Sequence, residues 1–276
     1  MLKDVSFGQY YPVDSFVHKL DPRFKLLCLI AYIAMIFVAA NFYGLAVCAA
    51  FFLLAVAASR VPFRKILRSV KGILFIAAFS AVLNIFFYRG ETVYAEWGIF
   101  CITYEGIIFS IFLVVRLFLL VMFSSLLTYT TTPMALTDGL ENLLTPLKLL
   151  RLPVREFALV MSITLRMIPT LMDETERIMN AQRARGADFE SGGLIKRVRA
   201  IVPILIPLMT SALRRADELG DAMDSRCYMG TYTAGAAKRT KYKKLAFTRR
   251  DLIGLLFAGA LIAGVILTKV YLGSLL

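Results

Sequence analysis

The chain has 276 residues, 59% of them hydrophobic, and a mean hydropathy of +0.71. This is more apolar surface than the core of a soluble protein of this length can bury, so lipid is the expected solvent for most of the chain. The net charge is +13, but the Lys and Arg residues lie between hydrophobic runs, which indicates loops on one side of a bilayer and not nucleic-acid binding.

The first hydrophobic run is long enough to cross a membrane twice. The N-terminal residues MLKDVSFGQYYPVDSF lack the basic-then-apolar pattern of a signal peptide, so we expect the run to be retained. Residues 26–58 carry no charge, and 33 helical residues would extend about 50 Å across a hydrocarbon core of about 30 Å. We therefore predict a helical hairpin with its turn at residues 41–44, where Asn41 and Gly44 favour a turn.

Three further spans are predicted at residues 72–88, 106–128 and 252–268, which gives five in all. The loop between the second and third spans is basic and contains no acid: Arg60, Arg64, Lys65, Arg68 and Lys71. The positive-inside rule makes this loop cytoplasmic, and alternation then fixes the other segments. The N-terminus lies inside, the acidic 89–105 loop outside, residues 129–251 inside and the C-terminus outside. The long inner segment, with 20 Lys and Arg against 13 Asp and Glu, agrees with this assignment.

Two cytoplasmic stretches, residues 157–172 and 200–213, are almost as apolar as the spans. The second has 14 residues, about 21 Å as a helix, and contains Pro203 and Pro207, so it is short for a crossing. We interpret both as helices that lie along the inner membrane face, covered by lipid and by another membrane protein. The alternative is that they form two extra spans.

Another interfacial helix is predicted to start at Pro133, with Thr132 as its N-cap, and to end before Pro153. Its apolar positions follow helical spacing: Leu136, Leu140, Leu143, Leu144, Leu147 and Leu150. The predicted fold is thus an all-α integral membrane protein with five transmembrane helices and about three cytoplasmic or interfacial coupling helices between the fourth and fifth. The domains are a four-helix membrane domain (1–128), a cytoplasmic coupling domain (129–251) and a fifth span (252–276).

The sequence favours a non-catalytic protein without cofactor or metal. It has no GxxxxGK[ST] motif to bind nucleotide phosphates, so the chain is not expected to be its own ATPase. His18 is the single histidine and the four cysteines are far apart, so neither a catalytic triad nor a zinc site is indicated. Adjacent acids such as Asp173 and Glu174 point about 100° apart on a helix and are best explained as solvated charges.

A motif occurs twice in the cytoplasmic region, as ERIMNAQRARG (176–186) and DELGDAMDSRC (217–227). Each copy is a predicted helix with an acid near its start and a small-Arg-small ending. Aligning Arg185 with Arg226, 41 residues later, places Ala184 on Ser225 and Gly186 on Cys227.

This ending suits docking into another protein, because small neighbours allow close approach and a guanidinium can bond bidentately to a carboxylate or cap carbonyl groups. For a single copy, the simpler explanation is an arginine that complements the helix dipole, worth up to about 1 kcal/mol. Two copies in a membrane protein without a nucleotide site favour docking. We therefore predict an ATPase-binding site made of Ala184, Arg185, Gly186, Ser225, Arg226 and Cys227.

At this point the chain resembles the T component, the transmembrane coupling subunit, of energy-coupling factor (ECF) transporters, which are ATP-binding cassette importers. The resemblance covers nearly the whole chain and includes SFGQYYPVDSFVHKLDPRFKLL, TTPMALTDGLENLLTPLKLLRLP, REFALVMSITLRMIPTLMDETERI, AQRARGAD and RRADELGDAMDSRCY. The family's two Ala-Arg-Gly motifs correspond to residues 184–186 and 225–227. The second departs from Ala-Arg-Gly at both flanks but keeps small residues.

The resemblance implies that the two helix ends insert into grooves on two cytoplasmic ATPase subunits. It further implies that the apolar coupling helices contact a membrane-embedded substrate-binding S component, and that the complex imports a vitamin or another micronutrient. The location implied is the bacterial cytoplasmic membrane.

Two alternatives remain at this stage: a secondary transporter or channel that works alone, and a membrane scaffold without a transport role. The first would need an intramembrane site, for which Arg116 with Asn84 is a sparse candidate. A structural pairing of Arg116 inside the bundle, with Asn84 or with backbone carbonyls, is the favoured interpretation. In the last span, Gly254 with Ala258 and Gly259 with Ala263 have the spacing for close helix packing, inside the chain or on a partner.

Overall fold

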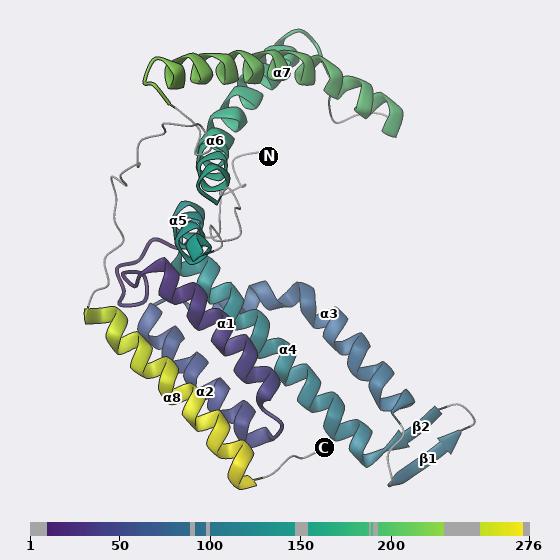
Figure 1. Ribbon diagram of the computed structural model, residues 1–276. Coiled ribbons are helices and arrows are strands. Elements are labelled where there is room, and N and C mark those ends of the chain that lie inside the picture. The colour runs from purple at the N-terminus through teal and green to yellow at the C-terminus, as the bar shows by residue number, and fades with distance from the viewer. Residues whose placement is uncertain are drawn as a thin grey trace. The chain divides into compact units, whose positions relative to one another are not determined.

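The computed structural model describes residues 10–88, 92–97, 100–146, 154–187, 189, 193–228 and 249–272. Over these residues the regular structure is helical apart from one two-stranded hairpin, so the predicted all-helical class is confirmed (Figure 1). The elements are α1 (Pro22–Val38), α2 (Phe42–Ser59), α3 (Phe63–Phe87), β1 (Val93–Trp97), β2 (Phe100–Thr103), α4 (Tyr104–Thr130), α5 (Pro133–Leu143), α6 (Val154–Ala184), α7 (Leu194–Asp224) and α8 (Arg249–Leu272).

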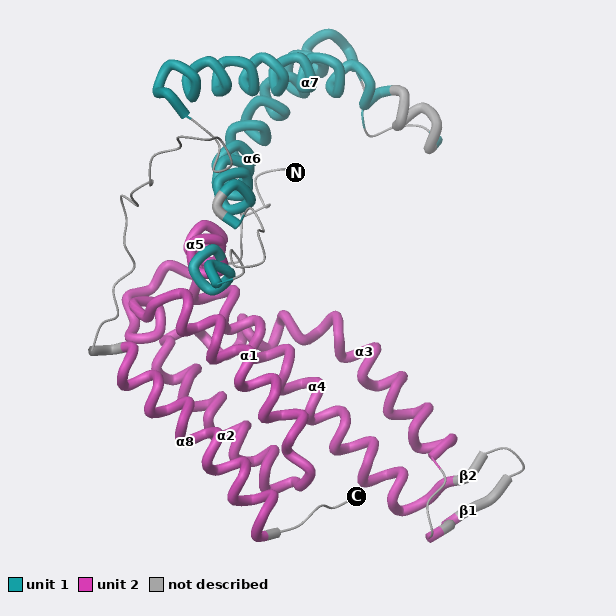
Figure 2. Tube along the Cα trace, in the orientation of Figure 1, with its two compact units in different colours: residues 1–7, 141–243 teal, residues 8–140, 244–276 magenta. Residues whose placement is uncertain are grey.

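The chain divides into two compact units (Figure 2). One, the bundle unit, comprises residues 8–140 and 244–276 and holds α1 to α4, most of α5, and α8. The other, the motif unit, comprises residues 1–7 and 141–243 and holds α6 and α7.

An aromatic core joins the helices of the bundle unit. Tyr32 of α1 is fully buried and stacks on Phe123 of α4, with ring centroids 3.9 Å apart. Its hydroxyl donates to the carbonyl of Cys48 in α2 at 3.1 Å, which satisfies the polar end of a buried tyrosine. These contacts fix α1, α2 and α4 to one another, and Leu261 and Val265 of α8 are buried in the same core.

Four helices are long and apolar enough to span a membrane: α2, α3, α4 and residues 251–271 of α8. They expose many large apolar side chains, and only 11% of the apolar stretch of α3 is buried within the chain. Such surfaces suit lipid or a membrane partner and not water. Helix α1 is equally apolar but has 17 residues, about 25 Å, at the lower limit for a span.

The boundaries of the helices differ from the prediction in two places. The turn between α1 and α2 occupies residues 39–41, so Phe42, Tyr43 and Gly44 belong to α2 and not to the turn. Helix α3 begins at Phe63, because Pro62 precedes it and the basic residues that follow are good helix formers. Most of the predicted basic loop is therefore the exposed first part of a 25-residue helix.

The predicted loop between the third and fourth spans contains a β-hairpin in which β1 pairs antiparallel with β2. Thr103, the last residue of β2, also caps α4, because its Oγ1 accepts from the amide of Gly106 at 3.2 Å. The backbone amide and the hydroxyl of Thr92 both donate to Glu105, which ties the start of the hairpin to the same helix end. The hairpin is thus attached directly to α4.

The small residues of α8 divide between two faces. A Cβ atom at Gly254 would lie 2.6 Å from Cε1 of Phe24, so a larger residue there would displace the buried Phe24 ring at the contact of α8 with α1. Gly259 faces open space among the described residues. The pair Gly254 and Ala258 therefore serves packing within the chain, whereas Gly259 and the exposed Ala263 lie on the outer face.

Helix α5 starts as predicted. The hydroxyl of Thr132 accepts from the amide of Ala135 at 3.3 Å, and Pro133 occupies the first helical position. The helix ends at Leu143, earlier than the predicted break at Pro153. Leu147, Leu150 and Pro153 lie outside the described residues.

The two apolar stretches that the sequence predicts to be cytoplasmic, residues 157–172 and 200–213, form parts of much longer helices. Both α6 and α7 have 31 residues, about 46 Å, and in each the apolar stretch is followed by a charged part that extends to the C-terminal end. They contact each other, and Arg215 of α7 bridges to Glu174 of α6 at 3.5 Å. Pro169, Pro203 and Pro207 lie inside these helices and do not end them.

Candidate functional site

The first arginine motif forms the C-terminal end of α6. Ala184 is the last helical residue, and Gly186 has a left-handed backbone with φ of +86°. The amide of Ala187 donates to the carbonyl of Gln182 at 3.0 Å, and the amide of Gly186 donates to that of Arg183 at 3.0 Å. These two bonds constitute a Schellman motif, which closes a helix end.

The second motif closes α7 with the same hydrogen bonds. The amide of Tyr228 donates to the carbonyl of Met223 at 3.0 Å, and the amide of Cys227 donates to that of Asp224 at 2.8 Å. Cys227 has φ of +52°, the left-handed conformation that Gly186 has in α6. A side chain in this region costs about 1 to 2 kcal/mol relative to glycine. The structural match between the two copies therefore persists despite an unfavourable residue.

In both motifs the arginine immediately precedes the left-handed residue. Arg185, Arg226 and their small neighbours Ala184 and Ser225 are all exposed. Within the part of the chain that the structure describes, neither guanidinium has a hydrogen-bond or ion-pair partner of its own. Each is therefore available to a carboxylate or to carbonyl groups of another molecule, for which its planar fork is suited.

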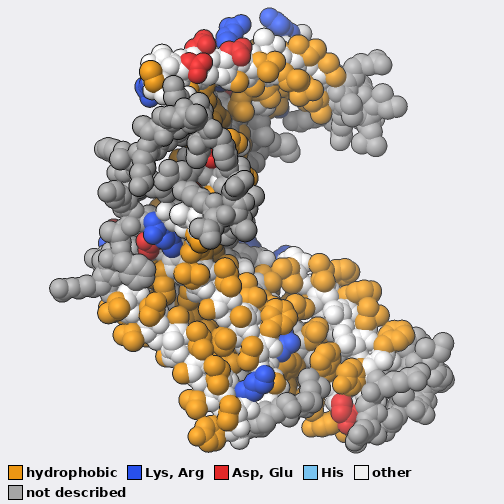
Figure 3. Space-filling view, in the orientation of Figure 1, with side chains coloured by type: hydrophobic (Ala, Val, Ile, Leu, Met, Phe, Trp, Pro, Cys, Tyr) orange, Lys and Arg blue, Asp and Glu red, His pale blue; other side chains and the backbone are white. Residues whose placement is uncertain are grey.

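The apolar parts of α6 and α7 provide a second candidate surface in the motif unit. Along α7 the exposed apolar residues recur at helical spacing: Ile201, Val202, Leu205, Ile206, Met209 and Leu213. On α6, Phe157 and Val160 are more than half exposed. Figure 3 shows hydrophobic side chains gathered over one part of α7 and charged ones over the other. A helix with an apolar half and an arginine end can contact two different environments.

Comparison with known proteins assigns the family. A family model described as cobalt transport protein (CbiQ) matches residues 14–235. The chain is 47% identical over 253 residues to the energy-coupling factor transporter transmembrane protein EcfT of Ruminiclostridium cellulolyticum, with 92% of each chain covered. It is 44% identical to the EcfT of Clostridium kluyveri, over 99% of this chain and 100% of the relative, and 44% identical to that of Bacillus subtilis, over 91% and 93%. The chain belongs to the CbiQ/EcfT family.

The resemblance noted in the sequence is thus confirmed. The predicted class, a membrane protein with a role in transport, is confirmed as well. The relatives are transmembrane components of ECF transporters, so family membership agrees with a non-catalytic subunit. The matched region of the family model ends at residue 235, beyond the second arginine motif, so both motifs lie inside it.

Arg116 has a structural role in this EcfT-family chain. Its Nη2 donates to the carbonyl of Ala39 at 2.8 Å, and its guanidinium lies 4.6 Å from the ring centroid of Phe112 and 5.6 Å from that of Phe37. The hydrogen bond to Ala39 is the pairing with a backbone carbonyl that the sequence favoured. Asn84, the other expected partner, instead donates to the carbonyl of Ser80 in its own helix.

Sequence reasoning missed a buried polar cluster around Lys25. This side chain is 6% exposed and donates to the carbonyls of His18 and Thr130, at 3.2 and 3.0 Å, and to the hydroxyl of Thr131 at 3.3 Å. Beside it, the buried Asp251 accepts from the amide of Asp21 at 2.9 Å. The available signal was a lysine and an aspartate that each directly precede an uncharged run in the sequence. Together they connect the ends of α1, α4 and α8.

Proposed function

We propose that this chain is the coupling subunit of an ECF-type importer. It transmits the ATP-driven motion of two cytoplasmic ATPases to a membrane-embedded S component, which binds a vitamin or another micronutrient. The observation that carries the proposal is the pair of equivalent Schellman ends, each with an exposed arginine, in a chain of the EcfT family.

Two equivalent ends fit two similar grooves, one on each ATPase. In this proposal Arg185 anchors one ATPase and Arg226 the other, each through a carboxylate or exposed carbonyls of the groove. Closing and opening of the ATPase pair on ATP binding and hydrolysis would move the two arginines relative to each other. Helices α6 and α7 are contiguous over 31 residues each, so a displacement of one end is carried to the apolar part.

The apolar parts of α6 and α7 are the proposed contact surface for the S component. Exposed side chains such as Ile206 and Leu213 are more than 60% exposed, which favours a hydrophobic partner and lipid over water. Tilting of the S component would then follow the displacement of these helices, and substrate bound outside would be delivered inside.

For the membrane arrangement we propose five spans, with α1 added to the four helices that are long enough by themselves. Helix α1 packs on α2, α4 and α8, so it shares their environment. The exposed basic residues Arg60, Arg64 and Arg68 mark the cytoplasmic face. The N-terminus and the motif unit are then cytoplasmic, and the β-hairpin and the C-terminus are outside.

The test is purification of the tagged full-length chain from its native membrane in mild detergent. We expect two ATPase chains and one small hydrophobic protein, and ATP-dependent substrate uptake when the complex is reconstituted in vesicles. A chain that catalyses ion- or substrate-driven uptake by itself would support a secondary transporter. A chain that co-purifies with neither ATPases nor a small membrane protein would leave only a scaffold role.

A further inference from the structure

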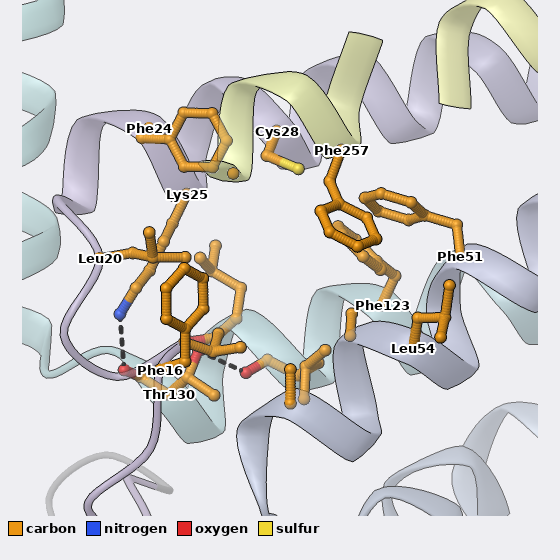
Figure 4. A pocket seen from close by; sticks show the side chains of 16 residues that line it. Phe16, Leu20, Phe24, Lys25, Cys28, Phe51, Leu54, Phe123, Thr130 and Phe257 are labelled. Atoms are coloured by element: carbon orange, nitrogen blue, oxygen red, sulfur yellow. Dashed lines mark hydrogen bonds between the residues drawn. The ribbon is translucent and has the colours of Figure 1, made fainter. Parts of the chain in front are cut away.

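An apolar cavity of about 310 Å³ opens in the bundle unit between α1, α2, α4 and α8 (Figure 4). Its walls are mainly large apolar side chains, which include Phe16, Leu20, Phe24, Phe51, Leu54 and Phe257. Lys25 and Thr130 reach its edge, but they are hydrogen-bonded to each other through the carbonyl of Thr130. The volume lies at the lower end of the range of about 300 to 1,000 Å³ that is typical of ligand pockets.

A second hollow, of about 520 Å³, adjoins the first, and we call it the polar hollow because charged side chains line it beside apolar ones. It is lined by Asp14, Ser15, Phe16, Lys19, Ala57, Ala58 and Arg60. Phe16 and Ala58 line both hollows, so the apolar cavity and the polar hollow are neighbours. Together the two hollows match the shape and polarity of an amphiphilic ligand, because an apolar compartment lies beside one that is lined by charged side chains.

The charges of the polar hollow favour an anion. Lys19 pairs with Asp14 at 3.1 Å, and both side chains are at least half exposed, so Lys19 keeps donors for another group. Arg60 is exposed, and among the described residues no carboxylate is paired with it. Its backbone is left-handed, with φ of +55°, a conformation that is common in the residue that ends a helix, here α2.

We propose that the two hollows form one binding site for an anionic glycerophospholipid. One acyl chain fills the apolar cavity, and the phosphate lies between Lys19 and Arg60. An empty apolar cavity would lower the stability of the bundle, and in a bilayer the nearest filling is hydrocarbon. An apolar peptide would fill the cavity but leave the two cations without an anion, so the charges favour the lipid.

The position along the membrane agrees with this occupant. Arg60 caps the end of α2 and lies next to the basic start of α3, where the charge pattern predicts the membrane surface. In the orientation proposed above this is the cytoplasmic leaflet, which carries the anionic lipids and where basic pockets between helices bind lipid headgroups. The assignment to the cytoplasmic leaflet depends on that proposed orientation. The chemistry of lipid binding is independent of it.

The experiment uses phosphatidylglycerol with a photoactivatable diazirine in one acyl chain. The full chain, with the subunits that co-purify with it, is reconstituted in phosphatidylcholine vesicles that contain the probe, and labelled peptides are mapped by mass spectrometry. We expect labels on the cavity wall, at residues 51–58, 123–130 and 254–257. A phosphatidylcholine probe with the same acyl chains should label these peptides at least about fivefold less, which is the effect of one basic side chain near an anionic lipid.

Two charge variants and one cavity variant test the site directly. Lys19→Gln and Arg60→Gln should each lower the labelling by phosphatidylglycerol about fivefold. Ala58→Trp should abolish it, because the indole occupies the boundary of the two hollows. The matched controls are Arg68→Gln, an exposed arginine outside both hollows, and Ala50→Trp, an exposed position on the same helix α2; both should label like the parent chain.

Because the readout is lipid labelling, its failure is distinct from failure of ATPase binding or uptake. If Ala58→Trp does not fold, as judged by gel filtration, the two charge variants decide the question. The proposal is overturned if both probes label the cavity equally, if the charge variants label like the controls, or if the labels spread evenly over outward-facing residues such as Phe75 and Ile76.

Discussion

Cys227 occupies at the end of α7 the position that Gly186 occupies at the end of α6. Both have a positive φ, and both directly follow the arginine of a motif closed by the same pair of hydrogen bonds. Geometry is thus preserved where sequence identity is not. This equivalence is the basis for treating Arg185 and Arg226 as two copies of one docking element.

Replacement of the two arginines tests that element. Arg185→Ala or Arg226→Ala removes one member of a charge-assisted contact with an ATPase, which typically costs about 2 to 5 kcal/mol. We expect each single variant to retain part of the ATPase and to transport poorly, and the double variant to lose both ATPases. Arg→Lys should rescue little, because a point charge does not reproduce the planar fork. The measurement is co-purification together with ATP-dependent uptake in vesicles.

The matched controls are Arg177→Ala on α6 and Arg214→Ala on α7, which remove exposed arginines outside the two small-Arg-small endings. Both should assemble and transport normally. Normal ATPase retention in the Arg185→Ala/Arg226→Ala double variant would contradict docking. It would leave both arginines with no role beyond a favourable interaction with the helix dipole.

The left-handed residues themselves can be exchanged. Cys227→Gly should stabilise the end of α7 by up to about 1 kcal/mol, because glycine accepts a positive φ without steric cost. Gly186→Ala should destabilise the end of α6 by a similar amount, since φ there is +86°. Hydrogen exchange at the amides of Tyr228 and Ala187, the outer bonds of the two motifs, reports each change. Equal exchange in parent and variants would contradict the strain assigned to Cys227.

The buried cluster around Lys25 should be a major contributor to the stability of the bundle unit. Lys25→Met removes three donated hydrogen bonds and leaves the carbonyl of Thr130 without that donor, which costs about 1 to 3 kcal/mol. The thermal midpoint in detergent should fall accordingly. Lys71→Met is the control, because Lys71 is exposed, and such a surface substitution usually changes stability by less than about 0.5 kcal/mol. Similar midpoints for the two variants would show that the cluster is not a determinant of stability.

His18 should make the segment before α1 sensitive to acid. Burial lowers the pKa of His18 below its usual 6.5, and the nearby Lys25 acts in the same direction. Nε2 lies 3.0 Å from the carbonyl of Tyr11, so it donates, and the unprotonated Nδ1 accepts from Ser15. The unfolded chain then binds more protons than the folded one, so stability is complete above about pH 6.5 and decreases as the pH falls toward the lowered folded value.

The measurement for His18 is exchange of its own backbone amide, which donates to Ser15 Oγ, at pH 5.5 and 7.5 after correction for intrinsic rates. Protection should be lower at pH 5.5. His18→Asn should remove the difference, and a pH effect that persists in this variant would assign it to another group.

The topology can be tested with single cysteines. Tyr94 is 70% exposed and Arg64 is exposed, whereas Ile66 in the same turn is buried and unsuitable. In a background in which all four native cysteines are replaced by alanine, an impermeant thiol reagent should reach Tyr94→Cys from outside and Arg64→Cys only from inside. Labelling of both positions from the same side would exclude the proposed arrangement.

Much of the secondary structure, and the helix ends that form the candidate site, could be predicted from the sequence, because both are local. Hydrophobic length and proline position indicated the helices, and Thr132 marked the start of α5 through a cap that spans three residues. The repeated small-Arg-small pattern predicted Arg185 and Arg226 as candidate docking residues, because the alignment requires only sequence spacing. The ends of the helices were predicted less accurately. The basic residues after Pro62 were predicted as a loop but are helical, because charged residues at a membrane surface occur in loops and in helices alike.

Tertiary structure alone decided which side chains meet across distant parts of the chain. Lys25 meets Thr130 across 105 positions, and Asp21 meets Asp251 across 230, distances at which no periodic pattern carries information. The left-handed state of Cys227 was equally hidden, because its own residue type disfavours it and only the closing bonds of α7 select it. The sequence by itself therefore determined the helices, the basic surface and the two arginines. Packing decided that Arg116 donates to a backbone carbonyl, that Gly254 lies against Phe24, and that an apolar cavity adjoins the polar hollow. Each of these depends on the three-dimensional fit of several helices.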